Sequence, residues 1–144
     1  MTPPAAPLHN GQKTILLVED EPAVRTLVTA ILSAQGYHVL DAPSGTEALR
    51  LIDRADRPIH LLITDIIMPG MNGRQLAAQL TTRYPTLRTL LISGYHDDAI
   101  VPADSTETGL PLLRKHFTPT ALAQRVREVL DAPQRPSTDL SAPP

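Results

Sequence analysis

The chain has 144 residues, of which 42% are hydrophobic and 19% charged, a length and mixture typical of one globular domain. Its formal net charge of −2 argues against nucleic-acid binding, because neutralising phosphates requires a basic face. The absence of cysteine excludes disulfides and thiolate metal sites, and no stretch approaches the roughly 18 apolar residues of a membrane span, so we expect a cytoplasmic protein without membrane contact.

Both ends of the chain are rich in proline and poor in apolar side chains. Residues 1–11 hold three prolines and residues 133–144 hold four. Such segments cannot bury enough apolar surface to offset the entropy lost on ordering. We therefore predict disordered tails at 1–11 and 133–144 and a single domain over residues 12–132.

The first half of that domain alternates short apolar runs with amphipathic helical patterns. In chain order, the predicted elements are a strand at Thr14–Val18, a helix from Pro22 to Gly36, a strand at Tyr37–Asp41 and a helix from Ser44 to about Arg54. Gly36 ends its helix at a position that tolerates positive φ. Ser44 and Glu47 have the spacing of a capping box.

The second half continues the alternation but contains one weak segment. The predicted elements are a strand at Ile59–Thr64, a helix with Leu76, Ala77, Leu80 and Tyr84 on one face, a strand at Leu87–Ile92, a strand at Leu110–Leu113 and a helix begun by Thr118 and Pro119. Residues 96–109 hold Pro102 and few apolar residues, so we expect the fourth helix to be short or degenerate.

Five strands alternating with helices predict an α/β fold, a doubly wound five-stranded parallel sheet covered on both faces. Parallel strands buried on both faces are continuous apolar runs, as these strands are. Pro111 lies within the last predicted strand and cannot donate to a hydrogen-bond ladder, so this strand is expected at the sheet edge.

Polar residues stand where the predicted strands end. They are Glu19 and Asp20 after the first strand, Asp65 after the third, Ser93 after the fourth and Lys115 after the fifth. Each alone is most often a turn or helix-capping residue. Ligands of open α/β sheets bind at the carboxyl ends of the strands, however, so five such residues at one edge indicate a site.

The residue types at this edge favour phosphoryl transfer with a metal ion. Three converging carboxylates repel by roughly 4 kcal/mol per pair at 4 Å and an effective dielectric of about 20. A cation would relieve that repulsion, and oxygen-only ligation suits Mg²⁺. With a lysine and a hydroxyl beside it, Asp65 is placed to attack phosphorus while its neighbours neutralise the phosphoryl oxygens.

Four segments resemble one known family. VEDEP, LLITDIIMPGMNG, LLISGY and LRKHF together are similar to the receiver domain of bacterial two-component response regulators. The SGY variant is most like receivers of, or serving, hybrid histidine kinases. The resemblance implies a flavodoxin-like sheet with strand order 2-1-3-4-5.

The resemblance also assigns roles to residues of this chain. It implies Asp65 as phosphoacceptor, Asp20 as a direct Mg²⁺ ligand, Glu19 acting through a metal-bound water, the backbone carbonyl of Ile67 as a further ligand, Ser93 on a phosphoryl oxygen and Lys115 paired with the phosphate. The expected protein is a single-domain response regulator, not an enzyme with substrate turnover. A sensor histidine kinase or histidine phosphotransfer protein would be its partner, and it would be a monomer or weak homodimer.

Two other functions stay open, and three positions depart from the family pattern. A pseudo-receiver would keep the fold without phosphorylation, whereas a haloacid dehalogenase-type phosphatase would need a carboxylate at Ile67.

Glu19 stands where aspartate is commoner, and Leu112 where many receivers carry an aromatic residue that flips on activation. His116 replaces a proline, so we predict a trans Lys115–His116 bond, since a cis bond there would cost about 2.5–4 kcal/mol.

Overall fold

The computed structural model of the chain describes residues 13–93, 111–115 and 117–132. The two predicted tails, the segment 96–109 with its expected short helix, and the Lys115–His116 bond lie outside these residues. The predictions made for them stay predictions.

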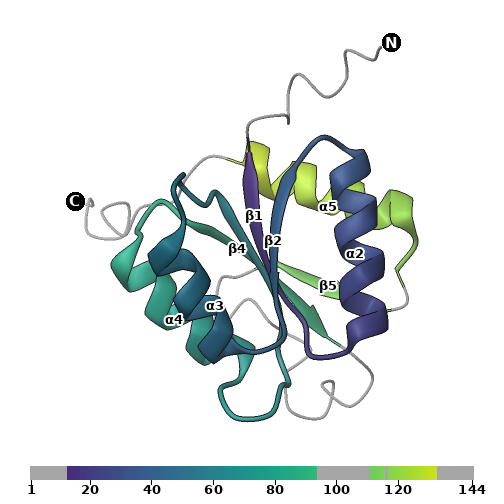
Figure 1. Cartoon of the computed structure of the whole chain (residues 1–144). Coiled ribbons are helices and arrows are strands. Elements are labelled where there is room, and N and C mark those ends of the chain that lie inside the picture. Colours follow the sequence, from purple (N-terminus) through teal and green to yellow (C-terminus); the bar gives the residue numbers. More distant parts are fainter. Residues whose placement is uncertain (1–12, 94–110, 116, 133–144) are drawn as a thin grey trace, which may run out of the picture.

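The described residues form a parallel sheet with helices on both faces (Figure 1). The strands are β1 (Thr14–Val18), β2 (His38–Ala42), β3 (Leu61–Asp65), β4 (Arg88–Ser93) and β5 (Leu112–Arg114), and the helices are α2 (Pro22–Ala34), α3 (Gly45–Arg54), α4 (Gly73–Arg83) and α5 (Pro119–Asp131). Every neighbouring pair of strands is parallel, in the order β2-β1-β3-β4-β5. The predicted fold class and strand order are confirmed.

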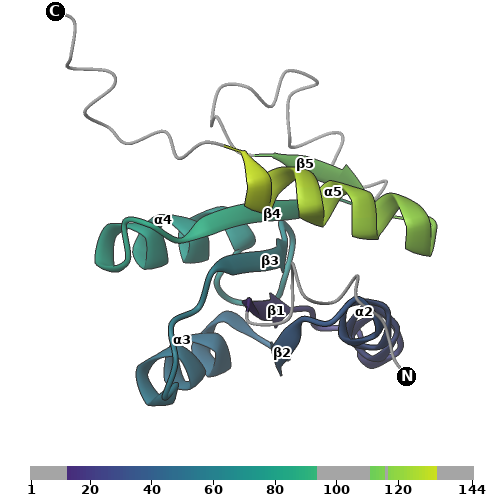
Figure 2. The same cartoon turned by 90° about the horizontal axis from the view of Figure 1, so that it is seen from above.

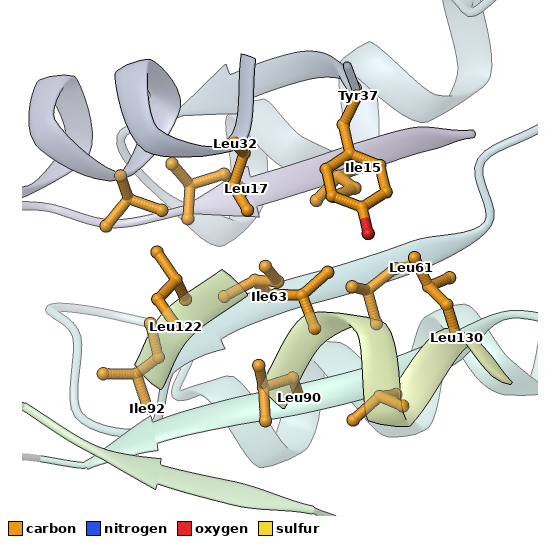
Figure 3. Close-up of a cluster of buried hydrophobic side chains, with 13 residues drawn as sticks. Ile15, Leu17, Leu32, Tyr37, Leu61, Ile63, Leu90, Ile92, Leu122 and Leu130 are labelled. Carbon is orange, nitrogen blue, oxygen red and sulfur yellow. The ribbon is translucent and has the colours of Figure 1, made fainter. Parts of the chain in front are cut away.

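The core consists of two apolar layers separated by the sheet. Helices α2 and α5 cover one face, and α3 and α4 cover the other (Figure 2). Alternate residues of one strand point to opposite layers, so Ile15 and Leu17 of β1 pack with α2 and α5 (Figure 3), whereas Leu16 packs toward α3 and α4. Burial on both faces is the reason that the inner strands β1, β3 and β4 are mostly apolar, whereas the edge strand β2 has exposed His38 and Asp41.

Local side-chain bonds and a glycine mark the ends of three helices. Gly36 follows α2 with φ of 95°, a value that favours glycine. Of the predicted Ser44–Glu47 capping box only one half forms: the Ser44 hydroxyl accepts a hydrogen bond from the Glu47 backbone N–H at 3.2 Å, whereas the Glu47 carboxylate accepts from Arg50 at 3.3 Å. Asn72 and Gln75 form a reciprocal capping box at the start of α4. These caps fix where each helix leaves the sheet.

Four of the five strands begin later than predicted, β2 and β4 by one residue and β3 and β5 by two. β5 begins at Leu112, two residues later than predicted, because Pro111 has no N–H and contributes only its carbonyl, which accepts from Leu91 N. β5 lies at the edge of the sheet, as Pro111 indicated. β3 begins at Leu61, although Ile59 packs against the α3 and α4 layer. An apolar side chain at a strand's approach can be buried before regular pairing starts.

The turn after β3 is held by a very close approach of α4. The N–H of Gly73 donates to the carbonyl of Ile66 at 2.7 Å. A Cβ atom on Gly73 would lie 2.0 Å from the carbonyl oxygen of Asp65, far inside van der Waals contact. Any larger residue at this position must displace the backbone that carries Asp65.

We predict that Gly73→Ala lowers the free energy of unfolding by about 1–3 kcal/mol or more, the usual range for overpacking a closely packed site. Urea denaturation measures the change. Gly45→Ala is the matched control, because Gly45 is also buried at the first position of a helix but its added Cβ would meet the flexible Met71 side chain at 3.0 Å. Equal losses in the two variants would contradict the proposed backbone clash.

Candidate functional site

The carboxyl edge of the sheet brings the predicted acidic residues together. Glu19 and Asp20 follow β1, and Asp65 ends β3, the neighbouring strand. Carboxylate oxygens of these three residues lie within 4.8 Å of one another. The turn after β1 and the end of β3 therefore form one cluster, as the strand-end positions predicted.

Ser93 and Lys115 reach the same edge from the next two strands. Ser93 ends β4, one residue beyond Ile92, the register partner of Asp65. Lys115 follows β5, and its backbone N–H donates to the Ser93 carbonyl at 2.6 Å. The Lys115 ammonium nitrogen lies 3.4 Å from Asp65 Oδ2 and 3.7 Å from Glu19 Oε2.

The polar atoms of the cluster are buried but incompletely paired. Glu19, Asp65 and Ser93 are at most 2% exposed, whereas Asp20 is more open to solvent. Glu19 Oε1, both carboxylate oxygens of Asp65 and the Ser93 hydroxyl make no hydrogen bond with the described residues. Buried oxygens in that state are unfavourable, so the site favours a ligand that would satisfy them.

Burial and like charge together disfavour ionised Asp65. Burial is the largest cause, and the adjacent Glu19 carboxyl adds to it, so that the pKa of Asp65 rises from 3.8 to about 9 despite the opposing effect of Lys115. For Lys115, burial lowers the pKa, but the carboxylates of Asp65 and Glu19 outweigh it and the net shift is upward. Lys115 therefore stays cationic, but its positive charge is not enough to keep the neighbouring Asp65 carboxyl ionised at its ordinary pKa.

The donor set fits a hard divalent cation. Three carboxylates with free oxygens, one of them open to solvent, match the oxygen ligands and retained waters that Mg²⁺ prefers. Ile67 lies two residues beyond Asp65, and the ligation by its carbonyl stays a prediction. Leu112 is partly buried against Ile66 and Leu91, so an aliphatic contact stands where many receivers have an aromatic side chain.

Two side chains at the site were not expected from the sequence. Glu21 Oε1 lies 3.2 Å from Lys115 Nζ, closer than either Glu19 or Asp65. Arg25, one turn into α2, donates to the Glu19 carbonyl at 2.7 Å and pairs with Asp41 at 3.3 Å. The acidic run at residues 19–21 was the available signal for Glu21, but Arg25 had none. Both restrain the turn that carries the acidic pair.

Comparisons with known proteins agree with this geometry. The family described as response regulator receiver domain matches residues 15–127. The chain is 37% identical to the sensor kinase CckA of Brucella abortus over 85% of its own length but only 13% of the kinase, and 32% identical to the receiver protein CpdR of that organism over 83% of its length and 98% of CpdR.

Solved structures give the same result. The receiver domain of the hybrid histidine kinase CckA is 36% identical, with a TM-score of 0.69 over 82% of this chain and 99% of that domain. A putative response regulator from Chloroflexus aurantiacus is 31% identical, with a TM-score of 0.72 over 84% and 99%. Among the residues that the structure describes, no helix has the length and apolar character needed to span a membrane.

We predict that Asp65→Asn raises the melting temperature of the metal-free protein, and that the gain grows as pH rises. The pKa of Asp65 is higher in the folded state than in the unfolded chain, so the folded protein holds more protons between pH 3.8 and about 9. Stability therefore falls as pH rises through that window, and the neutral amide removes this loss. Thermal melts in chelator across the window measure the difference, and a gain independent of pH would contradict the assigned cause.

Proposed function

Because the chain belongs to the family of response regulator receiver domains, we propose that Asp65 accepts a phosphoryl group from a partner histidine kinase or histidine phosphotransfer protein. The observation that carries the proposal is that both Asp65 oxygens accept no hydrogen bond from the described residues, although they are buried at the end of β3 beside the Lys115 ammonium and the acidic pair. An aspartate meant only for stability would have its oxygens satisfied by hydrogen bonds.

Asp65, Lys115 and Ser93 have different proposed roles in phosphoryl transfer. An Asp65 oxygen attacks phosphorus and forms the acyl phosphate O–P bond, while the N–P bond of the donor phosphohistidine breaks and its electron pair returns to the imidazole. Lys115 neutralises negative charge on the phosphoryl oxygens. The free Ser93 hydroxyl is available to donate to one of those oxygens.

Mg²⁺ is the proposed cofactor, held by Asp20, Asp65 and the Ile67 carbonyl, with Glu19 acting through a water. When bound, it would supply the positive charge that lets Asp65 ionise near neutral pH and would share a phosphoryl oxygen. The presence of all three carboxylates in one cluster supports a Mg²⁺-binding receiver over a pseudo-receiver. Ile67 offers no side-chain carboxylate as general acid, so a dehalogenase-type phosphatase is not supported.

The proposed biological role is a cytoplasmic phosphorelay component that acts as a monomer or weak homodimer. Its signal would leave by contact with a partner protein or by onward transfer of the phosphoryl group. The match to nearly the whole length of CpdR supports a single-domain regulator. The match to a small part of the sensor kinase CckA, and to the solved receiver domain of the hybrid histidine kinase CckA, supports a link to a hybrid kinase.

We predict that incubation with acetyl phosphate and Mg²⁺ adds the mass of one phosphoryl group to the wild type and none to Asp65→Asn. Intact mass spectrometry measures the adduct. Asp56→Asn is the matched control, because the Asp56 side chain is 95% exposed and lies outside the cluster, so this variant should be modified like the wild type. A full adduct on Asp65→Asn would refute the assignment of the acceptor.

A further inference from the structure

Lys115 has its shortest carboxylate contact with a residue outside the proposed phosphoryl site. Its ammonium nitrogen lies 3.2 Å from Glu21 Oε1, within hydrogen-bond distance. The distances to Asp65 Oδ2 and Glu19 Oε2 are 3.4 and 3.7 Å. One lysine therefore serves three carboxylates, and the best-placed partner is the one that takes no part in the phosphoryl chemistry proposed above.

Glu21 is held in place by its backbone. It is the residue before α2, where its carbonyl accepts the N–H of Arg25 at 2.9 Å and Pro22 takes the first helical position. Its own N–H donates to Glu19 Oε2 at 3.0 Å. Its side chain makes no helix-capping bond and is 60% exposed. The carboxylate thus projects from a fixed turn to the rim of the cluster and is free to bind the lysine.

Lys115 is held less firmly. It follows a three-residue edge strand, and its backbone N–H donates to the Ser93 carbonyl. Four methylene groups separate that anchor from the ammonium, which is a point charge on a flexible stem. The position of the charge is therefore determined mainly by the carboxylates around it. Any group that competes for Lys115 also sets how readily the lysine can pair with a phosphoryl group.

We propose that Glu21 is a positioning residue that holds the Lys115 ammonium at the mouth of the site and competes with the phosphoryl oxygens for it. This inference rests on the proposed function of Asp65. Before phosphorylation the Glu21 contact keeps the lysine over the acidic cluster. As the phosphoryl group arrives, Lys115 must exchange a carboxylate of Glu21 for a phosphoryl oxygen, so the contact slows phosphorylation.

The test measures the rate of phosphorylation by acetyl phosphate at saturating Mg²⁺, followed by intact mass over a range of donor concentrations. Glu21→Gln removes the charge but keeps the shape, and we expect its rate to rise roughly two- to fivefold, the factor that an exposed ion pair is worth. Glu128→Gln is the control. Glu128 is a half-exposed residue of α5 that pairs with Arg125 of the same helix, so its substitution also removes one carboxylate from an ion pair. Its rate should equal that of the wild type.

Glu21→Asp separates contact from charge. The aspartate keeps the negative charge at the same turn but is one methylene shorter, so it should lose the contact with Lys115 and react as fast as Glu21→Gln. An unchanged rate in Glu21→Gln would overturn the inference, as would a Glu21→Asp variant that reacts like the wild type while Glu21→Gln is faster. A wild type that gains no mass at all would instead refute the proposed function of Asp65, and this inference with it.

Discussion

Repulsion among the carboxylates of Glu19, Asp20 and Asp65 is opposed by too little positive charge, and this imbalance shapes the whole carboxyl edge of the sheet. The three groups lie within 4.8 Å of one another, with Lys115 as their cationic neighbour. At such separations each like-charged pair costs roughly 4 kcal/mol at an effective dielectric of about 20. The cluster is consequently stable only with a protonated carboxyl or an added cation, and the upward pKa shift of Asp65 reflects the first case.

The remainder of the fold keeps these groups together against their repulsion. Apolar layers on both faces of the sheet fix the strands, and the strands deliver Asp65 and its neighbours to one edge. Gly73 lets α4 pack directly on the backbone of Asp65, and Arg25 ties the acidic turn to Asp41. Restraints on both sides of the cluster prevent it from relaxing by moving apart. The repulsion is therefore relieved by a proton on Asp65 or by a bound cation, and not by separation of the carboxylates.

The sequence was sufficient for those features that follow from periodicity and strand ends. Apolar runs and helical patterns predicted the parallel sheet, and the residues directly after each strand predicted the cluster around Asp65. Contacts that depend on side-chain direction could not be predicted from the sequence. Glu21 and Lys115 are far apart in the chain, and nothing in the sequence around either residue indicates that they meet. The close approach of Gly73 to the Asp65 backbone was also not predictable, because it appears only in the packed structure.

The central proposal is that the acidic cluster binds a divalent cation, and Mg²⁺-dependent thermal stability tests it most directly. A ligand that binds only the folded state stabilises it by about 2.7 kcal/mol at one hundred times its dissociation constant. We therefore expect the melting temperature of the wild type to rise steadily with Mg²⁺, and Asp20→Asn to lose most of that rise. Asp53→Asn, which alters an exposed ion pair with Arg83, should respond like the wild type. A wild type with no Mg²⁺ response, or one that Asp20→Asn shares in full, would contradict the account.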